Sequence, residues 1–253
     1  ENFVTAFSND NTSYIKRYYL DLTLVENDSI YDRSPVILEP GYKFHRLAIA
    51  VDKSLNFIVG SSETDGQYDH RVLSLRYYKN RIKSGKWQAR GTISIGDNTL
   101  QTLSFVNSTH FTTFVSKLDF DAKPNHQQTR MEAIPFACTG SDIEVDGSYS
   151  TFAQMDPDQF SYEYDWRLKT ASLEKWNGVV GVFNDTTGLS AIVFDTQARP
   201  KNRYVIDPHS YERLPEPHDR FDIAASTRGG YAITFSRSTT QTTMVNGIPI
   251  IRF

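Results

Sequence analysis

Residues 46–62 read RLAIAVDKSLNFIVGSS, in which two apolar runs flank a short polar segment. Runs rich in β-branched and aromatic residues favour strands, whereas Asp, Asn, Ser and Gly between them favour a tight turn. Five other stretches have the same form: FVTAFSNDNTSYIKRYYLD (3–21), QTLSFVNSTHFTTFVSK (101–117), SDIEVDGSYSTFAQMD (141–156), GVVGVFNDTTGLSAIVFD (178–195) and FDIAASTRGGYAITFSR (221–237). The chain is therefore expected to consist largely of repeated β-hairpins.

The hairpins are regularly spaced along the chain. Successive turn centres are 43, 55, 39, 39 and 42 residues apart, at Asp10, Lys53, Ser108, Gly147, Thr186 and Arg228. Short strands that recur every ~40–45 residues are typical of a β-propeller, in which each repeat forms one four-stranded blade. The sequence thus predicts an all-β fold with a single β-propeller domain over residues 1–253. Six blades of four antiparallel strands are the preferred count, and five blades are the alternative.

Two details refine this prediction. The 55-residue step indicates an insertion in the second blade, which we place in the polar residues 61–70. Near the C-terminus, Asn246 and Gly247 separate TTMV from IPIIRF, and an Asn-Gly pair between apolar runs strongly favours a two-residue hairpin turn. This hairpin is expected to close the last blade.

Composition and charge exclude several classes of protein. The net charge is −3 and no Lys/Arg-rich block is present, so no nucleic-acid partner is expected. No apolar run reaches the ~18 residues of a membrane span. One Cys and six His without metal-ligand spacing predict no metal site. A Gly-rich phosphate loop and a Gly-x-Ser-x-Gly elbow are both absent from the sequence, so no cofactor is expected.

The sequence also bears on location. It begins at Glu1 without a Met or an apolar signal core, as a mature secreted chain would. Asn-x-Ser/Thr sequons, the acceptors of N-linked glycans, occur at Asn11, Asn27, Asn107 and Asn184. The single Cys138 cannot form an internal disulfide. A secreted glycoprotein is therefore the preferred expectation, with a cytoplasmic protein as the alternative.

Two Lys-Trp pairs suggest a binding function. Trp87 follows Ser84-Gly85-Lys86, and Trp176 follows Leu173-Glu174-Lys175, with SYEYDW (161–166) preceding the second pair. This pattern resembles the fungal fucose-binding lectins, which are six-bladed propellers. The resemblance implies sugar sites between blades, formed by an Arg on the second strand, a Glu on the third and an aromatic residue near the Lys-Trp turn. An aromatic face can stack on a sugar while charged groups bind its hydroxyls.

The resemblance is carried over to individual residues. Glu163 and Trp176 match in the fourth repeat, Trp87 matches in the second, and Arg17 in the first repeat resembles the arginine. No single repeat contains the whole pocket, which argues against six equal sugar sites. Two further aromatic residues, Tyr77 and Tyr78, are candidates for the rim of a shallow site.

Three functions remain open at this stage. The preferred one is a non-enzymatic, lectin-like propeller that binds a glycan or another small molecule. An enzyme is the first alternative, because Asp21, Asp156 and Asp195 occupy similar points of three repeats and could meet at a central channel for acid–base catalysis. A scaffold that binds a protein partner is the second alternative.

Overall fold

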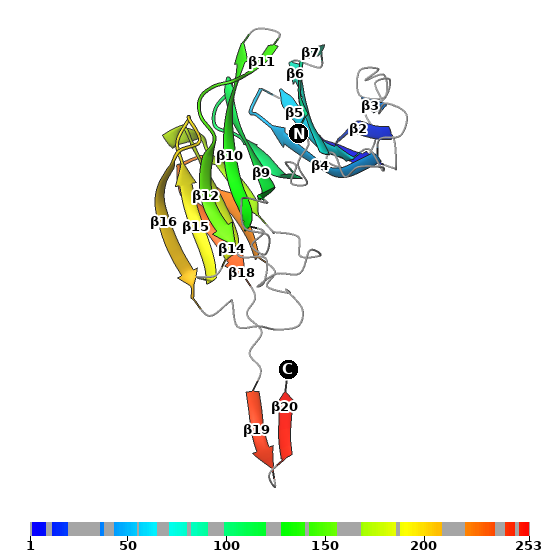
Figure 1. Cartoon of the computed structure of the whole chain (residues 1–253). Coiled ribbons are helices and arrows are strands. Elements are labelled where there is room, and N and C mark those ends of the chain that lie inside the picture. The colour runs from blue at the N-terminus through cyan, green and yellow to red at the C-terminus, as the bar shows by residue number, and fades with distance from the viewer. Residues whose placement is uncertain are drawn as a thin grey trace.

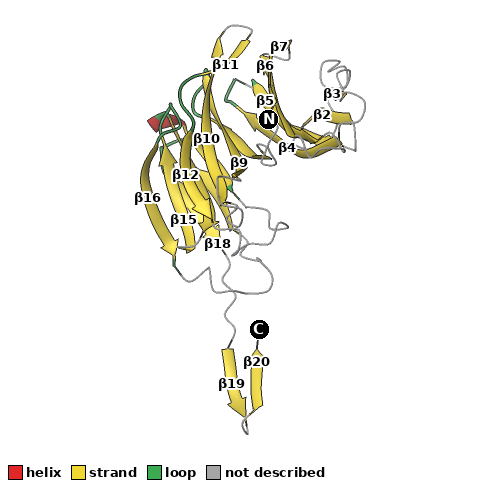
Figure 2. Cartoon of the chain, viewed as in Figure 1, coloured by secondary structure: helices red, strands yellow, loops and turns green. Residues whose placement is uncertain are grey.

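The structure is a computed structural model of the 253-residue chain, and almost all of its regular structure is β-strand (Figure 2). It describes residues 2–8, 12–19, 36–37, 43–54, 56–64, 71–79, 82–90, 99–119, 128–139, 142–155, 168–185, 188–208, 221–235, 241–245 and 248–252. Within these ranges no helix is long and apolar enough to cross a membrane. The predicted all-β class is confirmed.

The strands form small antiparallel sheets that follow one another along the chain. The first sheet contains β1 (Asn2–Ser8), β2 (Thr12–Tyr19) and β3 (Val36–Ile37). The second contains β4 (Lys43–Val51), β5 (Phe57–Thr64), β6 (Arg71–Lys79) and β7 (Ile82–Arg90). The third contains β8 (Thr99–Phe105), β9 (His110–Asp119), β10 (Gln128–Thr139), β11 (Asp142–Val145) and β12 (Ser150–Met155).

The fourth sheet contains β13 (Lys169–Leu173), β14 (Gly178–Asp185), β15 (Gly188–Phe194) and β16 (Pro200–Asp207), with the short 3₁₀ helix η2 (Glu174–Trp176) between β13 and β14. Two hairpins follow, β17 (Phe221–Ala225) with β18 (Tyr231–Phe235), and β19 (Gln241–Val245) with β20 (Ile248–Arg252). The predicted Asn-Gly hairpin is thus confirmed, since Val245 is the register partner of Ile248. Figure 1 shows β19–β20 apart from the body formed by the other sheets.

Consecutive sheets meet at their first strands. Contacts link β1 to β4, β4 to β8, β8 to β13 and β13 to β17. A hydroxyl pair crosses one of these junctions, where Thr102 Oγ1 lies 3.4 Å from Thr170 Oγ1. Each sheet therefore stands beside the next one in chain order, with its first strand nearest to its neighbours.

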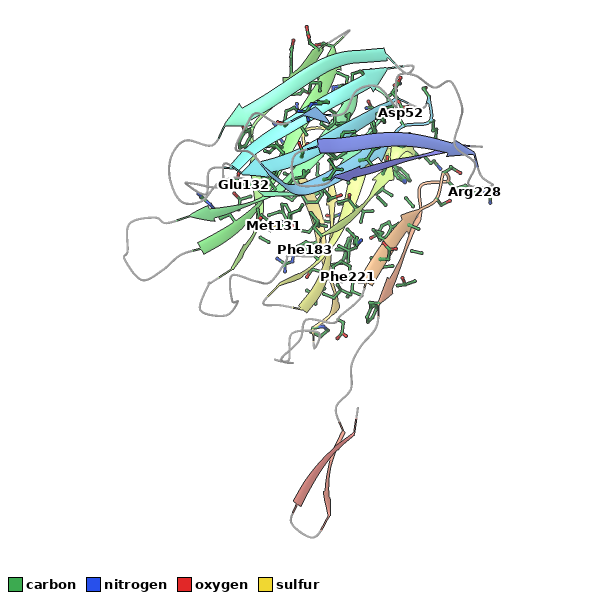
Figure 3. The ribbon with its side chains drawn as sticks, turned by 90° about the vertical axis from the view of Figure 1, so that its right-hand side faces the viewer. Asp52, Met131, Glu132, Phe183, Phe221 and Arg228 are labelled. Carbon is green, nitrogen blue, oxygen red and sulfur yellow. The ribbon has the colours of Figure 1, made fainter. Side chains whose placement is uncertain are left out.

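Apolar side chains fill the spaces between neighbouring sheets. Strands of the third sheet alternate, so that Phe111 and Val115 pack toward the second sheet whereas Phe114 packs toward the fourth. Both faces of this sheet are buried, which explains its nearly continuous apolar runs. Met131 and Phe183 lie in the layer between the third and fourth sheets, and Phe221 lies between the fourth sheet and β17–β18 (Figure 3).

A similar turn closes three hairpins at β4–β5, β15–β16 and β17–β18. In each, the first residue of the turn accepts hydrogen bonds from backbone N–H groups through its own side-chain oxygen. The same residue donates its N–H to the carbonyl four residues later. The acceptors are Asp52, Asp195 and Ser226, and Asn107 plays the same part in a shorter β8–β9 turn. Asp, Asn and Ser are favoured in turns because they can make these local bonds.

The structure corrects the assignment of two repeats. Residues 141–156 were expected to fold back on themselves, but β11 and β12 both pair with β10 and run in the same direction. They are one outer strand interrupted at residues 146–149, so the third and fourth repeats share one sheet. Within residues 178–195 the hairpin is present, but it joins the second and third strands of its sheet because β13 precedes it. The expectation of one sheet for each of the six repeats is therefore wrong.

The predicted insertion at residues 61–70 is wrong for its first four residues, and residues 65–70 lie outside the described residues. Residues 61–64 belong to β5, and the side chains of Ser61 and Ser62 are buried. Ser62 Oγ accepts a hydrogen bond from the backbone N–H of Leu100, which ties the second sheet to the third. Polar composition alone had made this strand look like a loop.

Candidate functional site

Trp176 is the most exposed large hydrophobic side chain of the described residues, at 65% of its full accessibility. It ends η2, in the connection between β13 and β14. Its indole Nε1–H donates to the carbonyl oxygen of Gly229, 2.8 Å away in the β17–β18 turn. Because this bond fixes the ring by its edge, Trp176 presents an aromatic surface whose orientation is set before any ligand arrives.

Charged side chains surround this indole. The Lys175 ammonium lies 5.4 Å from the centre of the Trp176 ring, within the range of a cation–π contact. Glu174 forms an ion pair with Lys53 from the β4–β5 turn. We call Lys53, Glu174, Lys175, Trp176 and Gly229 the turn cluster.

The turn cluster joins three turns that are far apart in sequence. Lys53 belongs to the second sheet, Glu174 to Trp176 belong to the fourth, and Gly229 belongs to the β17–β18 hairpin. Figure 3 shows Asp52 and Arg228, the neighbours of Lys53 and Gly229, toward the same end of the molecule. A ligand at this end could contact aromatic, cationic and anionic groups together.

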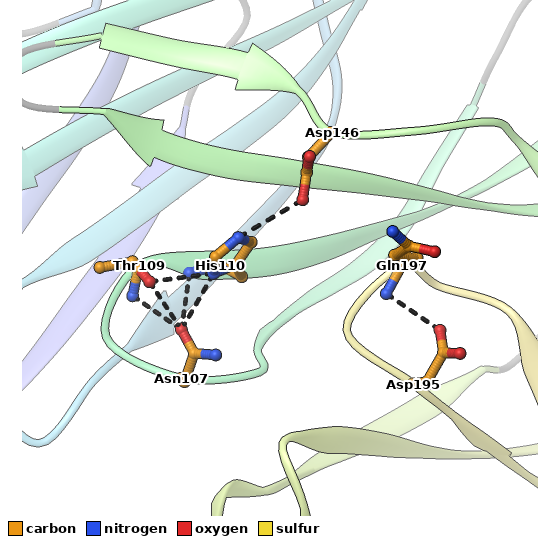
Figure 4. Close-up of polar contacts among 6 residues, drawn as sticks. All are labelled: Asn107, Thr109, His110, Asp146, Asp195 and Gln197. Carbon is orange, nitrogen blue, oxygen red and sulfur yellow. Dashed lines mark hydrogen bonds and ion pairs between the residues drawn. The ribbon is translucent and has the colours of Figure 1, made fainter.

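A second polar group joins β8–β9 to the interruption of the third sheet's outer strand (Figure 4). His110 Nε2 lies 3.4 Å from Asp146 Oδ2, and His110 Nδ1 lies 2.9 Å from Thr109 Oγ1. The order hydroxyl, imidazole, carboxylate is that of a nucleophile with its base. However, the Thr109 hydroxyl also donates to Asn107 Oδ1 at 3.0 Å, so its proton is already engaged within the turn.

Asp195, one of the three candidate catalytic carboxylates, has a structural role. Its Oδ1 accepts the backbone N–H groups of Gln197 and Arg199, each at 2.9 Å, and its Oδ2 pairs with Lys201 at 3.0 Å. Partial burial alone would raise the pKa of Asp195, but these donors and Lys201 outweigh it and lower the pKa. A carboxylate held ionised by its own turn is a poor proton donor.

Tyr77 lies in the core and not at a rim. Only 3% of its surface is exposed, and it packs in the cluster between the second and third sheets beside Cys138. Burial is the main cause that raises the pKa of Tyr77 to about 12 and that of Cys138 to about 12. Both groups are therefore neutral at physiological pH, and Tyr77 offers no face to a ligand.

The remaining candidates are less completely described. Trp87 lies in strand β7, where it pairs with Leu75, and not in a turn. Arg17 lies in the second strand β2, as expected, and Tyr78 lies in β6. Of these three residues only the backbone is described. The other candidates, Asp21, Asp156 and Glu163, lie outside the described residues.

The sequence pointed to Trp176 but not to its partners. No local pattern links it to Gly229 or to Lys53, because these contacts depend on how neighbouring sheets stand beside each other. Among the described residues, no group of three or more His, Cys, Asp or Glu side chains could hold a metal ion. No protein-family model matches the chain, and no curated protein sequence is significantly similar to it.

Proposed function

We propose that this protein is a non-enzymatic carbohydrate-binding protein of β-propeller architecture, with Trp176 as its principal sugar-stacking residue. One observation carries the proposal: Trp176 is 65% exposed, and its indole is held in place by the hydrogen bond that it donates to Gly229 of the neighbouring hairpin. Exposing a large aromatic ring is unfavourable in water, and a fixed orientation lowers the entropy cost of binding. The apolar face of a sugar ring is a ligand that suits such a platform.

The sheet arrangement supports a propeller with five blades. The second, third and fourth sheets are antiparallel meanders, they pack face to face, and their first strands adjoin. Blades in a propeller are arranged in this way around an axis. On this proposal β1–β3 belong to the first blade and β17–β20 to the fifth, which favours the alternative count over six.

The enzyme alternative receives less support. Of its three carboxylates, the described one, Asp195, closes a turn and has a lowered pKa. The Thr109–His110–Asp146 group is open to solvent and its hydroxyl is bonded to Asn107. A secreted location stays part of the proposal, and the sequon at Asn107 lies in an exposed turn where a glycan could be carried.

The test is a glycan array, followed by titration of the intact protein with each bound sugar. We expect Trp176→Ala to weaken binding by about fivefold or more, since stacking on an aromatic ring contributes about 1 kcal/mol or more. Tyr204→Ala is the matched control, because Tyr204 is also an exposed aromatic, at 51%, but lies on β16. Absence of binding to every glycan at millimolar concentration would disprove the proposal, and equal affinity of both variants would remove Trp176 from it.

A further inference from the structure

Strand β18 has one edge that pairs with none of the described strands. In the second, third and fourth sheets the second strand pairs on both sides, β5 with β4 and β6, β9 with β8 and β10, and β14 with β13 and β15. Among the described strands, β18 pairs with β17 alone. A two-stranded ribbon is only marginally stable in water, and an open edge invites another strand.

The hydrogen-bond pattern identifies the groups on this edge. The N–H of Ser226 donates to the carbonyl of Gly230, so this pair of the hairpin is the hydrogen-bonded kind. Bonded and non-bonded pairs alternate in an antiparallel ladder. Ala232 and Thr234 therefore bond to β17, whereas the N–H groups of Tyr231, Ile233 and Phe235 point away from it.

An independent contact supports this pattern. The N–H of Ile223, the register partner of Ile233, donates to the side-chain Oδ1 of Asp222 at 2.9 Å. It is thus not directed across to β18, as expected for a non-bonded pair. The free edge also carries apolar side chains, since Tyr231 is 39% and Phe235 is 44% exposed.

The β19–β20 hairpin has edges of two different kinds. Val245 and Ile248 flank a two-residue connection, and such flanking residues form a hydrogen-bonded pair. By alternation, Thr242 and Met244 direct their N–H groups away from β20. On the opposite edge Pro249 has no N–H, and proline is confined to outer edges of sheets. The hairpin can therefore extend a sheet through β19 but not well through β20.

We infer that β19 pairs with the free edge of β18 in the same chain, so that β17, β18, β19 and β20 form one four-stranded sheet. Residues 236–240 connect the two strands, and this length of five residues lies within the two to eight that join the second and third strands of the second, third and fourth sheets. A tethered partner also has a far higher effective concentration than a second copy. Matching the outward N–H groups places Ile233 opposite Thr242 or Met244.

This pairing gives strand β18 a second neighbour. It adds β19 beside β18, whose Ile233 packs against the fourth sheet. It also supports the β17–β18 turn that holds Trp176 through Gly229. The inference does not depend on carbohydrate binding, because its evidence lies in the strand edges alone.

Amide hydrogen exchange of the full chain, read by NMR, tests the pairing. The amides of Tyr231, Ile233 and Phe235 should be protected, and those of Ala232 and Thr234 serve as internal controls because β17 protects them in either case. Met244→Pro removes an N–H group that points toward β18 in the inferred pairing, and it should speed exchange at the three edge amides about tenfold or more. Ile251→Pro is the matched control, since the N–H of Ile251 points away from β19. Its loss should leave exchange at the three edge amides unchanged.

Several outcomes would overturn the inference. Fast exchange of Tyr231, Ile233 and Phe235 in the unmodified chain would show that the edge is open. Unchanged protection in Met244→Pro would exclude β19 as the partner. Protection that appears only in a dimer, measured by sedimentation, would assign the edge to the hairpin of a second copy instead.

Discussion

The indole of Trp176 and the carbonyl of Gly229 are joined by a 2.8 Å hydrogen bond between the fourth sheet and the β17–β18 hairpin. Gly229 has a φ of +91°, a conformation in which a side chain is strained, and a Cβ there would collide with the indole nitrogen. The two residues thus restrict each other: the glycine leaves the space that the indole edge fills.

We expect Gly229→Ala to displace Trp176 and to destabilise the protein by about 1–2 kcal/mol, through backbone strain and the lost contact. Intrinsic tryptophan fluorescence and thermal unfolding measure the two effects. The control is Gly230→Ala, because a Cβ at Gly230 has no atom within 4 Å apart from Gly230 itself and its two chain neighbours. If both variants behaved alike, the Trp176–Gly229 contact would not exist in solution.

Asp195→Ala should destabilise the protein by about 1–2 kcal/mol, because two backbone N–H groups lose their acceptor. Asp195→Asn keeps an acceptor oxygen and loses only the partly exposed pair with Lys201, so its cost should be smaller. Chemical denaturation of both variants compares these costs. If Asp195→Asn abolished a glycosidase or lyase activity while the protein stayed stably folded, Asp195 would have a catalytic role in addition to its structural one.

The lowered pKa of Asp195 also sets a pH dependence. Its contribution to stability is present above the ordinary pKa of Asp, about 3.9, and is lost as the pH falls through the lower folded value. Denaturation between pH 5 and pH 2 should therefore show a shallower loss of stability in Asp195→Asn than in the unmodified protein. Parallel curves would contradict the assigned pKa shift.

Cys138 should react slowly with iodoacetamide at pH 7, because burial raises its pKa to about 12 and the thiolate is the reactive form. The unfolded thiol ionises at lower pH than the folded one, so stability should fall as pH rises from about 9 toward 12. Mass spectrometry after timed alkylation measures the first effect. Denaturation of Cys138→Ser should show a smaller loss of stability at alkaline pH. Some loss should persist in this variant, because Tyr77 also has a pKa raised to about 12 and destabilises the folded protein in the same pH range.

Phe114→Ala should cost about 3–5 kcal/mol, since a fully buried ring would be replaced by a cavity. Its ring meets Phe152 and Phe194 edge to face, at centroid distances of 6.1 Å and 5.1 Å, in the layer that joins the third and fourth sheets. Tyr149→Ala, at a side chain that is 50% exposed, should change stability by less than about 0.5 kcal/mol. Thermal unfolding would contradict this assignment of the core if Phe114→Ala were as stable as Tyr149→Ala.

Strand composition and turn chemistry were sufficient to predict much of the fold. The β4–β5, β8–β9 and β17–β18 hairpins, and the one that ends the chain, lie where their apolar runs and turn residues indicate. The hairpin expected in residues 141–156 is wrong because a glycine such as Gly147 suits both an interruption of a strand and a reversal of the chain. Only the pairing of both halves with β10 distinguishes the two.

The candidate site was less accessible to sequence reasoning. Trp176 was singled out by its Lys-Trp pair, but its neighbours come from separate turns and leave no local signal. Tyr77 is a sequence candidate for the rim of a shallow site because it is aromatic, whereas the register of β6 places it in the core. Asp195 is a candidate catalytic group only under the enzyme alternative, since a carboxylate after a strand looks the same in sequence whether it binds substrate or its own backbone.

The turns that supply their own hydrogen-bond acceptors affect how this protein could evolve. In the turns begun by Asp52, Asp195 and Ser226, the first residue satisfies the backbone of the next ones. Exposed positions such as Lys53, Gln197 and Arg228 can therefore change without disturbing the packed sheets. Selection or loop grafting could alter the chemistry of this end of the molecule while the strands beneath it stay the same.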